Sequence, residues 1–195
     1  MLIHVNSAPD IRSALKIANE YNLDIILVGA KEAWRVAVDI AAANVPVILN
    51  PTDNLPSGFE AMAATLSNAE RLAAAGVTIA FYDSGIGYTH NTRSLPQLAG
   101  IAVANGLDYD TAIAAITANP AKIWGLGDKM GTLARGKRAD IVVWNGDPLE
   151  LASRPIAVII DGKLSDLDNR QAALARRYKD LSRKDLPRSY MGGEP

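Results

Sequence analysis

Residues 1–28 read MLIHVNSAPDIRSALKIANEYNLDIILV, and this stretch decides the fold. The apolar run of residues 1–5 predicts a short buried strand. Ser7 followed by Asp10 is typical of a helix start, because a serine there accepts a hydrogen bond from a backbone N–H of the first turn. Apolar residues then recur at the spacing of one helix face, and residues 24–28 predict a second strand.

The same strand–helix unit repeats along the first half of the chain. Further apolar strands are predicted at residues 45–49 and 77–82, with helices between and after them. In the longest of these helices we expect Phe59, Met62 and Leu66 on one apolar face. Strands that are apolar throughout and alternate with helices indicate a parallel sheet covered on both faces. The fold class is therefore α/β, with four βα units.

The pattern changes after the fourth unit. One more helix is predicted at residues 109–117. Short strands follow at residues 131–133, 140–144 and 157–160, and the last of them ends at a strong turn signal, Asp161-Gly162. A small β element is therefore expected after the α/β body, followed by a charged amphipathic helix and an irregular tail.

The composition excludes several classes of protein. The chain has 195 residues with a formal net charge of −1, which offers no general attraction to nucleic acid or to anionic membranes. It has no cysteine, so disulfides, thiolate metal sites and a cysteine nucleophile are excluded. We see no apolar run near the ~20 residues of a membrane span and no signal peptide in this chain. The compartment stays open between cytoplasm and bacterial periplasm.

Two segments carry a resemblance to a known family. Residues 116–126 read ITANPAKIWGL, and residues 131–148 read GTLARGKRADIVVWNGDP, followed by IAVIIDGK at residues 156–163. These motifs resemble the C-terminal end of the amidohydrolase superfamily, closest to its imidazolonepropionase-like members. In that family the first motif closes the barrel and the second returns the chain to a small β-sandwich.

The resemblance implies a fold and a division of the chain. The four βα units look like the C-terminal half of a (β/α)8 TIM-type barrel, followed by part of a small β-sandwich. On this basis residues 1–126 form the half-barrel, residues 127–165 the partial β-sandwich, and residues 166–195 a C-terminal helix and tail. The chain begins inside an apolar stretch, as though it started in the middle of a fold.

The resemblance also implies site residues. His4 matches the family's strand-five metal-binding histidine, and Asp83 matches the strand-eight aspartate that contacts the metal and takes a proton from the attacking water. Both lie near strand ends, where the active sites of such barrels are found. His90 and Arg93, which follow the fourth strand, are candidates for contact with a small-molecule substrate. Residues 28–30 depart from the family, because many members carry a strand-six histidine there.

The missing residues limit what the chain does alone. A catalytic zinc normally holds three protein ligands, and the chain has only His4 and His90 as histidines, so the family's first-strand His-x-His pair is lacking. We expect a divalent metal, zinc by preference, in the complete enzyme, and hydrolysis of a non-peptide C–N bond in a cyclic amide, a ureide or a dipeptide-like substrate. The alternatives are a non-catalytic half-barrel that is structural or binds a small ligand, and an autonomous doubly wound α/β domain.

The two outer strands of the predicted sheet indicate what the chain would associate with. Residues 1–5 and 77–82 are apolar and carry neither the lysine nor the proline that protects natural sheet edges. We therefore expect a homo-oligomer, or else a missing N-terminal half that supplies the other strands.

Overall fold

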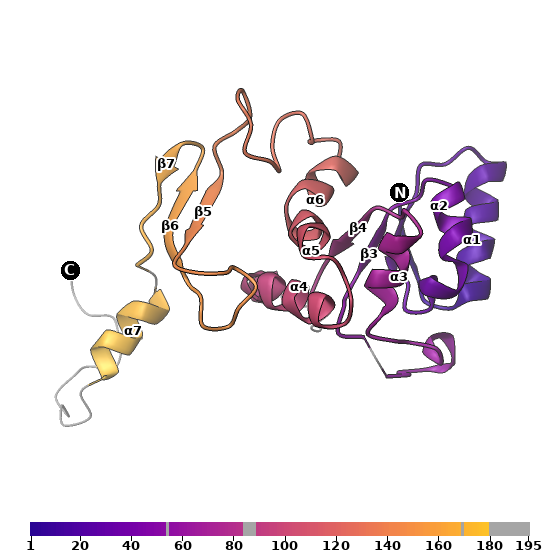
Figure 1. Cartoon of the computed structure of the whole chain (residues 1–195), viewed down its shortest axis with the longest axis horizontal. Coiled ribbons are helices and arrows are strands. Elements are labelled where there is room, and N and C mark those ends of the chain that lie inside the picture. The colour runs from indigo at the N-terminus through magenta and orange to yellow at the C-terminus, as the bar shows by residue number, and fades with distance from the viewer. Residues whose placement is uncertain (54, 84–88, 169, 180–195) are drawn as a thin grey trace, which may run out of the picture.

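The computed structural model describes residues 1–53, 55–83, 89–168 and 170–179. A parallel sheet and its helices form the N-terminal body, and a small antiparallel sheet and a last helix follow at the other end of the molecule (Figure 1). The described part of the chain contains no helix that is both long enough and apolar enough to cross a membrane.

The parallel sheet has its strands in the order in which they occur along the chain. They are β1 (Leu2–Val5), β2 (Ile26–Gly29), β3 (Val47–Leu49) and β4 (Ile79–Phe81). Because each right-handed crossover advances by one strand in the same direction, the helices are placed on a single face. A doubly wound domain reverses its strand order, and this sheet does not. The four predicted strands are confirmed, within a residue or two at their ends.

Helices connect these strands and continue past the last of them. They are α1 (Ala8–Glu20), η1 (Ala33–Val36), α2 (Ala37–Ala42), η2 (Phe59–Ala61), α3 (Asn68–Ala74), η3 (Thr89–Ser94), α4 (Leu95–Ala104), α5 (Tyr109–Ile116) and α6 (Ala118–Ile123). The predicted start of α1 is confirmed, because the Ser7 hydroxyl accepts a hydrogen bond of 3.3 Å from the backbone N–H of Asp10.

The hydrophobic core lies between the helices and one face of the sheet. Leu27, Leu49 and Ile79 point from the strands into this core, where Ile11 and Ile40 of the helices are fully buried. The sequence indicated a sheet covered on both faces, and this core covers one of them. The opposite face carries a row of side chains in register, His4, Val28, Ile48 and Ala80, and none of them belongs to the core cluster.

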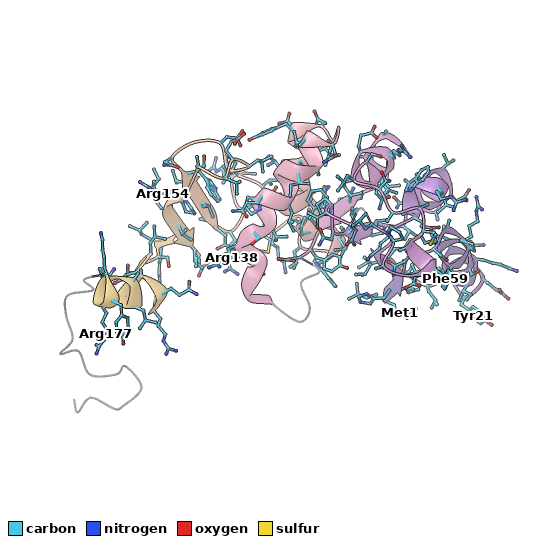
Figure 2. The ribbon with its side chains drawn as sticks, turned by 90° about the horizontal axis from the view of Figure 1, so that it is seen from below. Met1, Tyr21, Phe59, Arg138, Arg154 and Arg177 are labelled. Carbon is cyan, nitrogen blue, oxygen red and sulfur yellow. The ribbon has the colours of Figure 1, made fainter. Side chains whose placement is uncertain are left out.

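The prediction of one long helix around Phe59 and Leu66 is wrong. The structure has only the short η2 there, and α3 begins at Asn68. Phe59, which is labelled in Figure 2, is 94% exposed. The interruption has a tertiary cause: the backbone of Ala63 is held from both sides, its N–H by Glu32 and its carbonyl by the indole of Trp34.

The C-terminal region is a three-stranded antiparallel sheet. Its strands are β5 (Ile141–Trp144), β6 (Pro155–Ile160) and β7 (Lys163–Leu164), and the predicted turn joins the last two at Asp161-Gly162. The prediction of a strand at residues 131–133 is wrong, because these residues are irregular in the structure. The helix α7 (Arg170–Tyr178) comes last. The division at residues 126 and 165 stays a prediction.

Candidate functional site

Polar side chains gather at the carboxyl ends of the parallel strands. Asn6 follows β1, Lys31 follows β2, Asp53 lies in the loop after β3, and Tyr82 and Asp83 follow β4. Carboxyl ends of parallel strands lie at one edge of a sheet, and enzymes built on such sheets place their active sites there. This edge is therefore the candidate functional site.

His4 lies on the face of the sheet opposite the core cluster. It is exposed, it pairs in register with Val28 of β2, and its neighbours Ile3 and Val5 point to the opposite face, against the core. The exposed imidazole is accessible to a metal or a ligand on this face. The predicted position of His4 near a strand end holds in the structure, and its metal-binding role stays a prediction.

Asp83 lies at the far side of the sheet from His4. It is half-buried and follows β4, the strand at the other end of the order β1-β2-β3-β4. Neighbouring strands are about 4.8 Å apart, so three steps separate the two strands by roughly 14 Å along the sheet. The fold thus places both residues at the carboxyl ends of their strands, without making those strands neighbours.

The structure says less about Arg93 and His90, the two residues predicted to contact a substrate. Arg93 is exposed at the end of η3, and its guanidinium donates a hydrogen bond of 3.4 Å to the side-chain oxygen of Gln171 in α7. The backbone of His90 is part of η3, but its side chain lies outside the described residues. Contact of either residue with a substrate stays a prediction.

No complete metal site is formed by the described residues. Among them, no three side chains of histidine, cysteine, aspartate or glutamate lie close enough together to hold a metal ion. His4 and Asp83 have the nitrogen and oxygen donors that zinc accepts, but a catalytic zinc needs three protein ligands. Within the part of the chain that the structure describes, the residues do not fit a metal on their own.

The structure shows a polar cluster at this edge that sequence reasoning missed. The ammonium of Lys31 donates a hydrogen bond of 3.0 Å to the Ser57 hydroxyl and lies 3.7 Å from a carboxylate oxygen of Asp53. Burial raises the pKa of the nearby Tyr82 phenol above its ordinary value, and the negative charge of Asp53 raises it further. The only signal in the sequence was that each of these residues follows a predicted strand.

Glu32 fixes the structure around this cluster. It is 3% exposed, and its two carboxylate oxygens accept hydrogen bonds from the backbone N–H groups of Ala8 (3.2 Å) and Ala63 (2.9 Å). Burial alone would raise the pKa of the Glu32 carboxyl. These two hydrogen bonds and the charge of Arg35, 3.4 Å away, outweigh it and lower the pKa. One carboxylate thereby ties the start of α1 to the end of the loop that carries Asp53.

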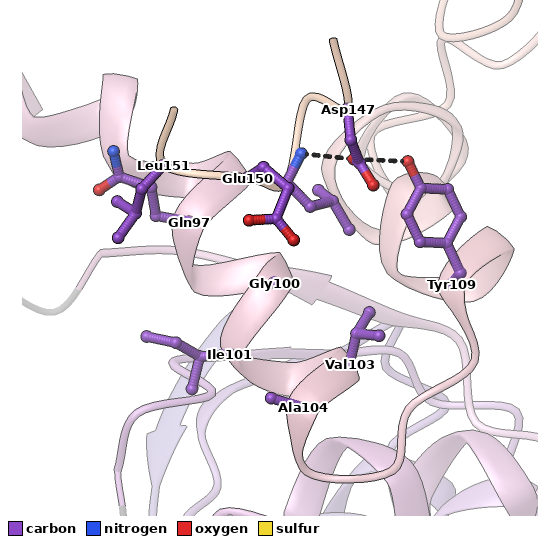
Figure 3. Close-up of a pocket in the computed structure, with 10 residues that line it drawn as sticks. Gln97, Gly100, Ile101, Val103, Ala104, Tyr109, Asp147, Glu150 and Leu151 are labelled. Carbon is purple, nitrogen blue, oxygen red and sulfur yellow. Dashed lines mark hydrogen bonds between the residues drawn. The ribbon is translucent and has the colours of Figure 1, made fainter. Parts of the chain in front are cut away.

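A pocket of about 390 Å³ lies away from this edge, between α4, the start of α5 and residues 147–151. Figure 3 shows Asp147 accepting hydrogen bonds from the Tyr109 hydroxyl (2.8 Å) and the backbone N–H of Leu149 (2.9 Å). At Gly100 a Cβ would come within 2.8 Å of the Leu149 carbonyl oxygen, so glycine permits this close approach. None of the predicted site residues lines the pocket, and we assign it to packing of residues 147–151 on α4.

Comparisons with known proteins agree with this architecture. An imidazolonepropionase of Aromatoleum aromaticum is 38% identical over 114 residues, 57% of this chain and 26% of that protein. A 5-methylthioadenosine/S-adenosylhomocysteine deaminase of Desulforudis audaxviator is 30% identical over 113 residues, 54% of this chain and 25% of that protein. The solved structure of an amidohydrolase from Thermotoga maritima superposes with a TM-score of 0.76 at 30% identity, over 85% of this chain and 43% of that one.

The chain thus spans less than half the length of these relatives. The Amidohydrolase family model matches residues 10–165, which begin inside α1 and include β2, β3, β4, the helices that follow them up to α6, and the small antiparallel sheet. This match covers most of the chain and both segments that suggested the resemblance. The chain belongs to the Amidohydrolase family.

Proposed function

We propose that this chain forms the C-terminal half of a (β/α)8 barrel in a metal-dependent hydrolase of non-peptide C–N bonds, and that it is inactive alone. The observation that carries the proposal is the position of His4 and Asp83, both at the carboxyl ends of strands in a sheet whose order never reverses. In this arrangement the small antiparallel sheet is part of a β-sandwich. The family match and the relatives, an imidazolonepropionase and a deaminase among them, support C–N hydrolysis.

His4 and Asp83 have separate roles in this proposal. In the complete enzyme His4 would supply one imidazole ligand to the metal, and the carboxylate of Asp83 would be a further ligand and would accept the proton of the attacking water. A bound zinc would lower the pKa of that water to about 7. The carboxylate would then pass the proton to the leaving nitrogen, which stays in the ring-opened product of a cyclic amide and departs as ammonia or an amine from an open-chain substrate. The remaining ligands come from outside the described residues, since these hold no group of three.

The substrates proposed are small cyclic amides, ureides and dipeptide-like molecules. The cluster of Lys31, Asp53 and Tyr82 supports a polar substrate, because it lines the same edge of the sheet with one cation, one anion and one neutral phenol. A charge-balanced lining of this kind suits a molecule that carries both hydrogen-bond donors and acceptors.

The test compares the chain alone with the chain joined to an amidohydrolase half that supplies the His-x-His pair. We expect the 195-residue chain to retain less than about a tenth of an equivalent of zinc after dialysis, because two candidate ligands do not make a site. The joined protein is expected to retain zinc and to hydrolyse members of the substrate panel, giving a ring-opened acid from a cyclic amide and free ammonia or amine from an open-chain substrate. Its His4→Ala variant should lose most of the zinc. Stoichiometric, tightly held zinc in the chain alone would refute the incomplete site.

A second function is favoured by one observation. Because the described residues hold no group of three metal ligands, a non-catalytic half-barrel that serves as a structural or small-ligand-binding unit is the alternative. Zinc in the joined protein that does not depend on His4 would support this alternative.

A further inference from the structure

Lys31 and Asp53 lie beside each other after β2 and β3, two strands that pair directly. Their side chains are mostly buried, at 18% and 19% exposure, and the Lys31 ammonium is 3.7 Å from Oδ1 of Asp53. An N–H···O hydrogen bond spans about 2.7–3.2 Å, so this distance is too long for one. The two groups therefore attract each other by charge without a hydrogen bond between them.

Both groups keep hydrogen-bonding capacity that the described residues do not use. An ammonium has three N–H donors, and within the described part of the chain Lys31 uses one of them, on the Ser57 hydroxyl at 3.0 Å. Oδ2 of Asp53 is buried without a hydrogen-bond partner among these residues, which leaves Oδ1 as the oxygen that a ligand can reach. Buried polar groups are nearly always hydrogen-bonded, and an exception calls for an explanation such as a functional role.

The neighbouring Glu32 shows how a structural carboxylate is bonded in this protein. Both of its oxygens accept hydrogen bonds from backbone N–H groups, at 3.2 and 2.9 Å. The carboxylate of Asp53 has no such bonds within the described residues, although its side chain is also mostly enclosed. The Lys31–Asp53 pair is thus less suited to holding the fold together than to contact with a ligand.

The backbone that leads to Lys31 is strained. Gly29 and Ala30 have φ values of 85° and 49°, in the left-handed region, which is unfavourable for alanine because of its Cβ. Ala30 is fully buried, its N–H donates to the Val5 carbonyl at 2.7 Å, and its carbonyl accepts from the Asn68 amide at 3.0 Å. Strain of this kind persists where the surrounding structure enforces it, and it clusters at binding and active sites. Here it turns the chain at the end of β2 and fixes the backbone next to Lys31.

The loop that carries Asp53 is braced as well. The side-chain oxygen of Asn50, a residue that is 5% exposed, accepts hydrogen bonds from the backbone N–H and the hydroxyl of Thr52, at 2.9 and 2.7 Å. The backbone N–H of Asp53 donates to the Asn50 carbonyl at 3.3 Å. Both members of the Lys31–Asp53 pair are therefore presented from fixed backbone, and fixed groups bind a ligand with little loss of conformational freedom.

A cation and an anion side by side match one kind of molecular edge. In a cyclic amide or cyclic ureide the ring holds an N–H and a C=O on the same side, in the cis arrangement, so that both point at the same partner. A linear secondary amide is almost always trans, and its N–H and C=O point in opposite directions. An amide nitrogen in proline has no N–H at all. A cis edge can bond to both groups of the pair, and the other two cannot.

We propose that Lys31 and Asp53 are specificity-determining residues that bind a cis-amide edge of the substrate. The ammonium donates to the C=O, and Oδ1 of Asp53 accepts from the N–H. Because β2 and β3 are the middle strands of the sheet, a molecule bound to this pair lies between the strands of His4 and Asp83. The inference rests on the proposed function for the class of bond that is hydrolysed, and it selects cyclic amides and ureides over linear dipeptide-like substrates.

Binding is measured on the 195-residue chain itself by NMR titration with hydantoin, a small cyclic ureide. We expect saturable shifts of the backbone amide signals of Lys31 and Asp53. Binding of 1,3-dimethylhydantoin, which has no N–H, and of N-methylacetamide, a linear amide, should be weaker by at least about tenfold, because a hydrogen bond to a charged group is lost. Equal affinity for the three compounds, or no hydantoin binding at these two residues, overturns the proposal.

Variants of Lys31 separate recognition from folding. Lys31→Met keeps the length of the side chain and should weaken hydantoin binding by about tenfold, whereas Lys31→Arg should retain most of it. The matched control is Lys16→Met on the exposed side of α1, which should bind like the wild type. The double variant Lys31→Met/Asp53→Asn should unfold at no lower urea concentration than the wild type, because both charges are removed together. Unchanged binding in Lys31→Met, or early unfolding of the double variant, overturns the proposal.

The joined protein with its supplied His-x-His pair distinguishes this inference from the proposed function. If it hydrolyses nothing while the chain still prefers hydantoin, the hydrolase is refuted and recognition of the cis edge stands. If it hydrolyses linear dipeptide-like substrates faster than cyclic ones, recognition of the cis edge is refuted and C–N hydrolysis stands.

Discussion

Replacement of Glu32 by glutamine is expected to destabilise the chain by removing one acceptor from a buried site. In the native protein each carboxylate oxygen of Glu32 accepts a different backbone N–H, from Ala8 and from Ala63. Glutamine has the same size but only one accepting oxygen, and its NH2 group would face the other N–H. One buried donor is therefore left without an acceptor.

The size of the effect follows from the burial of the site. Leaving a buried hydrogen-bonding group unsatisfied costs about 1–3 kcal/mol, and more where the lost partner was charged. Glu32 is 3% exposed, so water replaces the lost acceptor poorly. We expect Glu32→Gln to lower the free energy of unfolding by about 2 kcal/mol, and Glu32→Ala, which orphans both N–H groups, by about twice as much.

Urea denaturation followed by circular dichroism measures this difference. The matched control is Glu20→Gln at the exposed end of α1, where a surface substitution is expected to stay within about 0.5 kcal/mol. A Glu32→Gln protein as stable as this control would refute the role of Glu32 as a link between α1 and the loop before α3.

The stability difference between wild type and Glu32→Gln should change with pH in one direction. The pKa of Glu32 is lowered in the folded protein relative to its ordinary value of 4.5. Its contribution is therefore complete above the unfolded pKa and is lost as the pH falls through the lower, folded pKa. The difference in unfolding free energy between wild type and Glu32→Gln should be constant from neutral pH to about pH 5 and should shrink at more acidic pH.

Three further predictions concern the site and the packing. In the complete enzyme, Asp83→Asn should lower kcat by at least about a hundredfold with little change in KM, because a proton acceptor is lost in the transition state. Steady-state kinetics measure this, and a change in kcat of only a few-fold would contradict the role of Asp83. Gly131→Ala should lower the free energy of unfolding by about 1–3 kcal/mol more than the control Gly136→Ala, as measured by thermal or urea unfolding. Both glycines have a positive φ, but a Cβ at Gly131 would lie 2.6 Å from the Cβ of Ala121, whereas a Cβ at Gly136 would meet no atom within 4 Å. Ser7→Ala should cost about 1 kcal/mol in the same unfolding assay through loss of the α1 N-cap, and no loss would show that the cap is dispensable.

Much of the fold was predictable because its signals are local. The strands are visible in the sequence as short apolar runs, and Ser7 marks the start of α1 because it accepts a hydrogen bond from a residue three positions away. The turn at Asp161-Gly162 is equally local, since both residues take the positive φ values that such turns need. Asn119, part of the NPAK motif, also has a physical role here, because its amide bonds to the outer edge of β4.

The same local reasoning failed where distant residues decide the outcome. The periodicity around Phe59 is that of a helix, but Glu32 and Trp34 hold Ala63 from about 30 residues away and the chain turns instead. For a related reason, the apolar pattern did not show what covers the second face of the sheet. Apolar strands look the same whether the second face meets helices or the interior of a barrel, and only the strand order separates the two cases.

By itself, the sequence determined the class of the fold, the order of its strands and helices, the family motifs, and the positions of His4 and Asp83 near strand ends. These properties depend on periodicity, turn residues and motif spacing, which are written along the chain. Tertiary structure alone decided that Glu32 is a buried link and that Lys31, Asp53 and Tyr82 come together. Each of these depends on contacts between residues more than 20 positions apart, and such contacts leave no periodic trace in the sequence.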